Sequence, residues 1–256
     1  MMVKNNVYYG IIRFGYQNIV VAIVLLFLWW LITLSDIPSF LLPTPKSVLL
    51  ALWHERYTLA HHGLITVLEM IAGLLIGILL GSLLAIGMIF FPVLEHWLVP
   101  VVLISQIIPA LSLAPLLVLW FGYGMSAKIA MTSLIIFFPV TSSFFDGLRR
   151  VNSDYLDLAI TLGASSYTQF RHVRLMAALP AFSSGIRMAV ASAPTGAIIG
   201  EWVGSAKGLG YIMLNANARM QTDLCFAAIF ILILITLFLW NLFNRLIKHF
   251  IFWEKT

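Results

Sequence analysis

Residues 146–180 read DGLRRVNSDYLDLAITLGASSYTQFRHVRLMAALP and form a long polar stretch in an otherwise apolar chain. We call this stretch the polar segment. Of the 15 lysines and arginines in the chain, the polar segment holds Arg149, Arg150, Arg171 and Arg174. A membrane protein places basic connecting segments on the cytoplasmic side. The polar segment is therefore the first candidate for contact with a cytoplasmic partner.

The composition indicates a membrane protein. Of the 256 residues, 61% are hydrophobic and only 10% are charged, and the mean hydropathy is +1.00. A soluble domain carries about 25% charged residues. The apolar runs do not alternate with polar residues as the strands of an outer-membrane barrel do. We predict an all-α polytopic membrane protein with a single transmembrane domain over residues 1–256, whose polar connecting loop covers about 146–180.

Six apolar runs approach or exceed the length of about 20 residues that a helix needs to cross a bilayer. They cover residues 18–34, 64–91, 97–121, 128–145, 186–203 and 225–247. Prolines gather in the third to fifth runs. A proline in a membrane helix is tolerated where the freed carbonyl faces protein or a wet cavity, so these runs are predicted to line a cavity. The alternative is that prolines are simply common in membrane helices.

The charges predict the orientation. With the N-terminus inside, ten basic residues are cytoplasmic: Lys4, Arg13, Arg149, Arg150, Arg171, Arg174, Arg187, Arg245, Lys248 and Lys255. Five are outside: Lys46, Arg56, Lys128, Lys207 and Arg219. The excess predicts that both termini and the polar segment are cytoplasmic. The net charge of +5 follows from this topology, so we expect no nucleic-acid partner.

The polar segment is predicted to form a helix, a glycine turn and a second short helix. Gly163 can adopt a positive φ and end the first helix. Ser166 and Gln169 fit a capping box for the second helix, which is expected to stop at Leu179 because Pro180 follows. Tyr167 and Phe170 are three residues apart and share a helix face. This aromatic pair could enter a groove on another protein, or the helix could lie on the membrane surface.

The sequence 157–165, followed by Leu175 and by Leu179-Pro180, resembles the EAA-type loop of ABC importer permeases. In that family the loop is a coupling helix that docks into a cleft of the cytoplasmic ATPase. Asp157 stands where glutamate is usual, Leu158 where the first alanine is usual, and Met176 where the first proline is usual. The resemblance implies a type I importer architecture and an ATPase-coupling role for these residues: Asp157, Ala159, Gly163, Ala164, Ser165, Tyr167, Phe170, Leu179 and Pro180.

Further motifs are similar to the nitrate/sulfonate/taurine-type branch of these permeases. They are the sequences at 42–45, 119–124, 201–204, 208–211 and 222–224. The sequence 121–124 and the stretch 106–115 look closest to permeases for the thiamine pyrimidine precursor. The resemblance implies a dimer of two permease copies, a dimer of ABC ATPases, an extracytoplasmic substrate-binding protein and a small polar substrate, all at a bacterial inner membrane.

Five polar residues within the spans are candidates for the substrate pathway. Glu69 lies about one turn inside the second span, where a carboxylate is costly unless it is paired or wet; alternatively it reaches water at the outer interface. Glu201 could help to close an outer gate or act as an interfacial anchor. Gln106, Ser192 and Thr195 could hydrogen-bond a polar substrate, although small polar residues also hold helices together.

The sequence lacks the common catalytic motifs, including a Walker motif. The single cysteine, Cys225, excludes an intrachain disulfide and a cysteine-cluster metal site, so we assign neither a metal nor a cofactor. Two other functional classes would require features that this sequence does not clearly show. An ion-coupled secondary transporter normally shows an internal repeat or several buried charges, and a membrane-embedded enzyme needs clustered catalytic residues. We therefore predict a transport subunit without enzymatic activity of its own.

Overall fold

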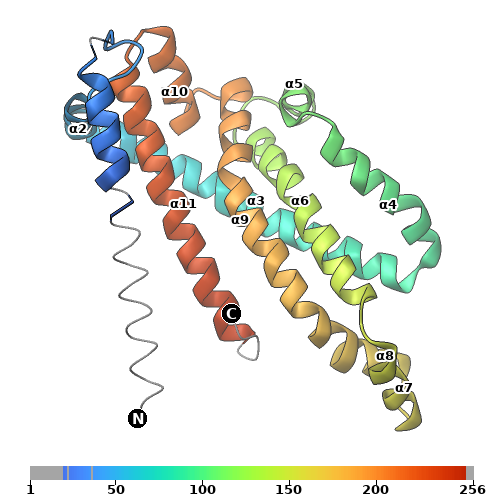
Figure 1. Cartoon of the computed structure of the whole chain (residues 1–256). Helices are drawn as coiled ribbons and strands as arrows, with labels where there is room; N and C mark the ends of the chain where they lie inside the picture. The colour runs from blue at the N-terminus through green and yellow to red at the C-terminus, as the bar shows by residue number, and fades with distance from the viewer. Residues whose placement is uncertain (1–19, 22, 36, 252–256) are drawn as a thin grey trace, which may run out of the picture.

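The computed structural model describes residues 20–21, 23–35 and 37–251, and over these residues the chain is helical and without strands. Four long helices dominate Figure 1: α3 (Arg56–Phe90), α6 (Met125–Arg149), α9 (Leu175–Gly204) and α11 (Thr222–Phe250). Each is long and apolar enough to cross a membrane. The polar segment projects beyond the bundle at one end, and α2 (Pro45–His54) and α10 (Leu209–Ala218) lie at the other.

A bent helix pair supplies a further span. Helices α4 (Pro92–Ile107) and α5 (Ala110–Phe121) meet at an angle of 105° and together pass the criteria for a membrane span. The first predicted span, 18–34, lies partly outside the described residues, and its described part is an apolar helix over Ile23–Thr33. The described residues thus contain four or five spans, so the prediction of six is not confirmed in number.

The prolines interrupt the helices less than the sequence predicts. Among the prolines of the third to fifth predicted spans, Pro109 coincides with a break, whereas Pro139 and Pro194 lie inside continuous helices, as does Pro180 ahead of the fifth span. The predicted helix end at Leu179 is therefore wrong. The helix continues through Pro180 because Ala178 of α9 is buried in a core with α6 side chains such as Phe144, Phe145 and Leu148, and tertiary packing overrides the local preference of proline.

Helix α3 packs closely against α6 along a ridge of glycines. A Cβ atom at Gly73 would lie 2.5 Å from the Thr132 side chain, and one at Gly77 would lie 2.8 Å from Ile136 Cγ2. Real Cβ atoms do not approach other atoms this closely, so these positions need glycine. Gly73, Gly77 and Gly81 recur at every fourth residue, which is the small-xxx-small spacing that allows close helix packing in membranes.

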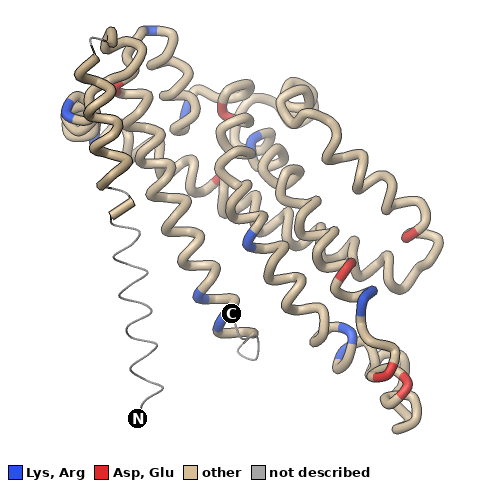
Figure 2. The backbone as a smooth tube through the Cα atoms, viewed as in Figure 1, with Lys and Arg blue, Asp and Glu red and all other residues tan. Residues whose placement is uncertain are grey.

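Helix α9 packs against α6 in the same way. A Cβ at Gly196 would lie 2.7 Å from Thr132 Cα, and one at Gly200 would lie 2.9 Å from Lys128 Cα. At the other end of the contact, a Cβ at Gly185 would lie 2.9 Å from the Pro139 carbonyl oxygen. Helices α3, α6 and α9 thus form a tightly packed core. Figure 2 shows few charged residues along these long helices.

Candidate functional site

The first helix that lies wholly within the polar segment is α7 (Ser153–Thr161), and both of its ends are capped by hydrogen bonds. The Asn152 side chain accepts a hydrogen bond from the Asp154 amide at 3.0 Å. At the other end, the Gly163 amide donates to the Ile160 carbonyl at 2.8 Å and the Ala164 amide donates to the Ala159 carbonyl at 2.9 Å. This is the hydrogen-bond pattern of a Schellman motif. Gly163 has φ +77°, as the sequence predicts.

The cap of the second short helix lies one residue earlier than predicted. Ser165, and not Ser166, precedes α8 (Ser166–Gln169), and its Oγ accepts from the Thr168 amide at 3.3 Å. The Gln169 side chain donates to the Ala164 carbonyl at 2.9 Å instead of reaching back to the cap amide. The predicted capping box is therefore wrong in register. The two adjacent serines have the same side chain, so residue type alone does not distinguish between them as the cap.

Helix α8 continues through a π-helical turn, η1 (Phe170–Arg174), into α9. This arrangement separates the predicted aromatic pair. Tyr167 is exposed and accepts a hydrogen bond from Arg171 Nη1 at 3.4 Å. Phe170 instead packs on Phe90 of α3, with ring centroids 4.8 Å apart. The prediction of two exposed aromatics is wrong for Phe170, which anchors the polar segment to the bundle.

The exposed surface of the polar segment is more apolar than the motif alone indicates. Four large side chains of α7 and its turn are exposed: Tyr155, Leu158, Ile160 and Leu162. They flank Asp157, which is exposed on the same helix. Leu179 and Pro180 lie apart from this surface, half-buried within α9. Exposed apolar groups of this kind commonly mark a protein interface, and sequence reasoning missed the leucines because they read as ordinary helix residues.

A cavity lies beside the break between α4 and α5. Its volume is about 490 Å³, and its lining includes Gln106 of α4 and both Ser192 and Thr195 of α9. Pro109 at the break and Pro139 of α6 complete the wall near these polar groups. The structure therefore brings together three of the five predicted pathway residues, next to two of the prolines that indicated a cavity. No described residue in this lining is charged.

Glu69 and Glu201 are not in that cavity. Glu69 of α3 is fully buried, and its carboxylate forms an ion pair with Nζ of Lys128 on α6. Lys128 Nζ also donates to Ser205 Oγ at 3.0 Å and to the Lys207 carbonyl at 3.4 Å. Burial excludes the reading in which Glu69 reaches water. The sequence held a signal for this pair, since charges within membrane spans usually pair with one another.

Glu201 ties the start of α10 to the core. It is fully buried, so it is not an interfacial anchor. Its carboxylate accepts hydrogen bonds from Thr66 Oγ1, at 2.6 Å, and from the Gly210 amide. Gly208 precedes α10 with φ +117°, and a Cβ there would lie 2.1 Å from the Glu201 side chain. We call Glu69, Lys128 and Glu201, with the loop groups that they bind, the buried charge cluster.

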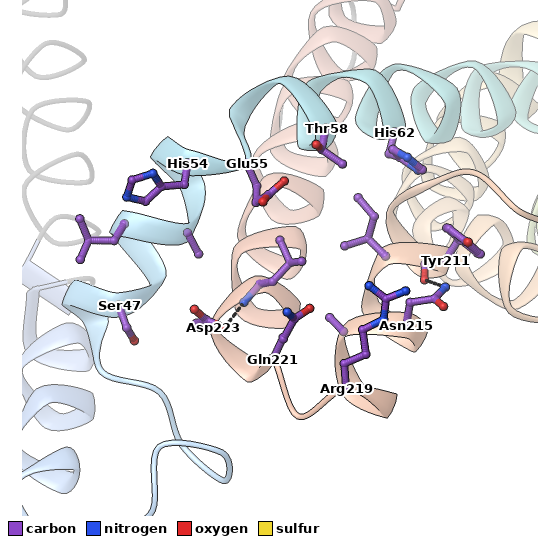
Figure 3. A pocket seen from close by; sticks show the side chains of 15 residues that line it. Ser47, His54, Glu55, Thr58, His62, Tyr211, Asn215, Arg219, Gln221 and Asp223 are labelled. Carbon is purple, nitrogen blue, oxygen red and sulfur yellow. Dashed lines mark hydrogen bonds between the residues drawn. The ribbon is translucent and has the colours of Figure 1, made fainter.

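A polar groove lies at the same end of the bundle as the buried charge cluster. It has a volume of about 620 Å³ and lies between α2, α3, α10 and α11. Figure 3 shows polar side chains from these helices around it: Ser47, His54, Glu55, Thr58, His62, Tyr211, Asn215, Arg219, Gln221 and Asp223. No pattern in the sequence indicates this groove, because its residues come from four separate helices and the ends beside them.

The described residues hold no group of three or more histidine, cysteine, aspartate or glutamate side chains suited to a metal ion. The chain thus presents an exposed polar segment, a neutral cavity at a helix break, and a polar groove at the far end. Residues 73–252 match the model of a protein family described as the binding-protein-dependent transport system inner membrane component. The chain belongs to this family.

Related proteins agree with this assignment. The permease is 48% identical to a probable ABC transporter permease of Haemophilus influenzae over 89% of this chain and 94% of the relative. It is 36% identical to the formylaminopyrimidine transport permease ThiX of Halalkalibacterium halodurans, over 84% and 87%. It is 30% identical to the taurine transport permease TauC of Escherichia coli, over 84% and 82%. The resemblance found in the sequence motifs is thereby confirmed.

A solved structure shows the same fold. The permease matches a chain of a crystal structure of an amino acid ABC transporter with histidines, with a TM-score of 0.60 over 80% of this chain and 98% of the other. The identity is 16%, so this match concerns the fold alone. Together with the family, it identifies an all-α multi-pass ABC importer permease. The secondary-transporter alternative is not favoured.

Proposed function

We propose that two copies of this permease form the pathway of an importer, and that the polar segment of each copy docks on one subunit of a cytoplasmic ABC ATPase dimer. The observation that carries the proposal is the exposed apolar surface of α7 and its turn, held beyond the bundle by the Schellman motif at Gly163. An aromatic and aliphatic surface of this kind suits insertion into a groove. The ATPase supplies the hydrolysis, and this chain supplies no catalytic group.

The proposed topology places both termini and the polar segment in the cytoplasm. The polar groove then faces the outside, where an extracytoplasmic binding protein delivers the substrate. Alternating access follows from this arrangement. ATP closes the ATPase dimer, the two polar segments move together, and the cavity opens toward the binding protein. Because α8, η1 and α9 are continuous, movement of the polar segment is transmitted directly to Ser192 and Thr195 in the cavity wall.

The proposed substrate is a small neutral polar heterocycle of the pyrimidine-precursor type. The support for this proposal is the chemistry of the side chains that line the cavity. The cavity offers hydroxyl and amide groups, from Ser105, Gln106, Ser192 and Thr195, and its described lining has no cation. An anion such as a sulfonate or nitrate would lose its hydration there without a compensating charge. A pyrimidine bearing amino groups can instead exchange hydrogen bonds with these side chains and pack on Phe138.

The test is uptake by the permease reconstituted in liposomes with its ATPase and binding protein. We expect ATP-dependent uptake of a radiolabelled aminopyrimidine that taurine and nitrate do not inhibit. Gln106→Leu is expected to lower this uptake about 5–150-fold, because a lost hydrogen bond to the enclosed substrate costs about 1–3 kcal/mol. A polar-to-apolar change outside both the cavity and the polar groove, Thr236→Val of α11, is the control. Uptake of taurine with no uptake of the pyrimidine would overturn the substrate proposal, whereas uptake without ATP would overturn the importer proposal.

A further inference from the structure

A basic pocket lies between α9 and α11. It has a volume of about 370 Å³, and its lining consists of Arg187, Trp240, Asn241, Asn244, Arg245 and Lys248. The last four of these residues follow the spacing i, i+3, i+4 and i+7. This spacing puts them on one face of α11. Arg187 approaches that face from α9, where its Nε donates to Asn244 Oδ1 at 3.2 Å.

Among the residues that the structure describes, the three cations of the basic pocket have no acidic counterpart. Within the described ranges, no carboxylate forms an ion pair with Arg187, Arg245 or Lys248. Other basic residues of the permease do have such partners. For example, Arg149 pairs with Glu95 at 3.3 Å, and Arg150 lies 3.7 Å from Asp146. Three like charges beside one cavity repel one another, so an anion in the pocket would relieve that repulsion.

The surroundings indicate where such an anion comes from. The neighbouring side chains of α11 are large, apolar and exposed: Leu237, Phe238, Leu242 and Leu246. A helix face of this kind contacts lipid acyl chains in a membrane. Trp240 beside the cations is typical of the level where acyl chains meet headgroups. A phosphate that is attached to acyl chains can therefore satisfy the cations and the apolar face together, which a soluble phosphate cannot.

We infer that the basic pocket binds the phosphate headgroup of an anionic phospholipid. The Arg187 and Arg245 guanidinium groups and the Lys248 ammonium group donate to the phosphate oxygens, and the Asn244 side chain orients Arg187 toward them. Basic pockets between transmembrane helices on the cytoplasmic side are suited to headgroups such as cardiolipin. The assignment to the inner leaflet rests on the proposed topology, whereas the assignment of the ligand does not.

The test measures the phospholipids that stay bound to the full-length permease when it is isolated with its partner subunits in a mild detergent. The test variant is Arg187→Gln/Arg245→Gln/Lys248→Gln. The control variant, Arg149→Gln/Arg150→Gln/Arg219→Gln, removes the same charge elsewhere. We expect phosphatidylglycerol and cardiolipin per permease, counted by native mass spectrometry, to fall at least 5-fold in the test variant and less than 2-fold in the control. Equal retention in both variants would overturn the inference.

A second arm separates a lipid from a soluble anion. Tryptophan fluorescence of the permease in phosphatidylcholine nanodiscs is followed while phosphatidylglycerol or inorganic phosphate is added. We expect a saturable change with the lipid that Trp240→Phe abolishes, and no change with millimolar phosphate. A response to phosphate equal to the lipid response would refute a lipid site. If the triple variant fails to fold, the exposed single change Lys248→Gln replaces it, with an expected loss of about half the bound anionic lipid.

Discussion

The turn at Gly163 allows the coupling proposal to be tested with little effect on packing. Gly163 has φ +77°, and an added Cβ would meet nothing within 4 Å. Within the permease, a side chain at this position therefore acts through backbone strain and not through packing. For a residue other than glycine, the left-handed conformation costs about 1–2 kcal/mol, and valine should reach the upper end of that range because it is β-branched. A cost of this size lowers the ratio of native to non-native turn about 5–30-fold.

Gly163→Val should therefore insert into the membrane normally and lose about 5–30-fold in ATP-driven uptake. Gly163→Asn should retain most uptake, because asparagine adopts the left-handed conformation more readily. Gly122→Val is the matched control. Gly122 has φ +76° with nothing within 4 Å of an added Cβ, and it lies outside the polar segment. The assay is uptake in proteoliposomes, normalised to permease content. Wild-type uptake by Gly163→Val, or an equal loss in the valine and asparagine variants, would refute the reasoning.

Three further changes test the packing and the docking surface. Lys128→Met leaves Glu69 buried without its partner, so the free energy of unfolding in detergent should fall by about 3–5 kcal/mol. Adding Glu69→Gln to this variant should recover part of the loss. Gly77→Leu should abolish stable expression, because a Cβ there already lies 2.8 Å from Ile136 Cγ2 and overpacking costs about 1–3 kcal/mol. Tyr167→Ala, an exposed change, should leave the melting temperature unchanged and weaken co-purification of the ATPase; a large drop in melting temperature would argue for a structural role.

Features with local causes were predictable from the sequence. The turn at Gly163 follows from the conformational freedom of glycine between two helical patterns, and the structure has it with φ +77°. The close packing of α3 follows from the spacing of Gly73 and Gly77. A cavity was indicated by the prolines that gather in the third to fifth runs, and Pro109 and Pro139 line one. In these three cases, residue type and spacing along the chain were sufficient to predict the structural feature.

Features that depend on distant partners were not predictable. Phe170 looks like an exposed partner of Tyr167 on a helical wheel, but Phe90 of α3 covers it. Pro180 looks like a helix end, but the burial of Ala178 against α6 holds the helix together. From its position at the end of a predicted span, Glu201 looks like an interfacial residue, but the loop before α10 covers its side chain. Each error arose because local preference was applied where tertiary contacts determine the conformation.

The central claim is that the polar segment contacts the ATPase, and site-specific photo-crosslinking tests it directly. A photoreactive phenylalanine analogue replaces Tyr167, which is 65% exposed, or Trp53 of α2, which is 67% exposed at the other end of the bundle. The two probes are thus matched in accessibility. We predict a covalent adduct between position 167 and the ATPase subunit, and none from position 53. The absence of an ATPase adduct at position 167, or equal adducts from both positions, would contradict the account.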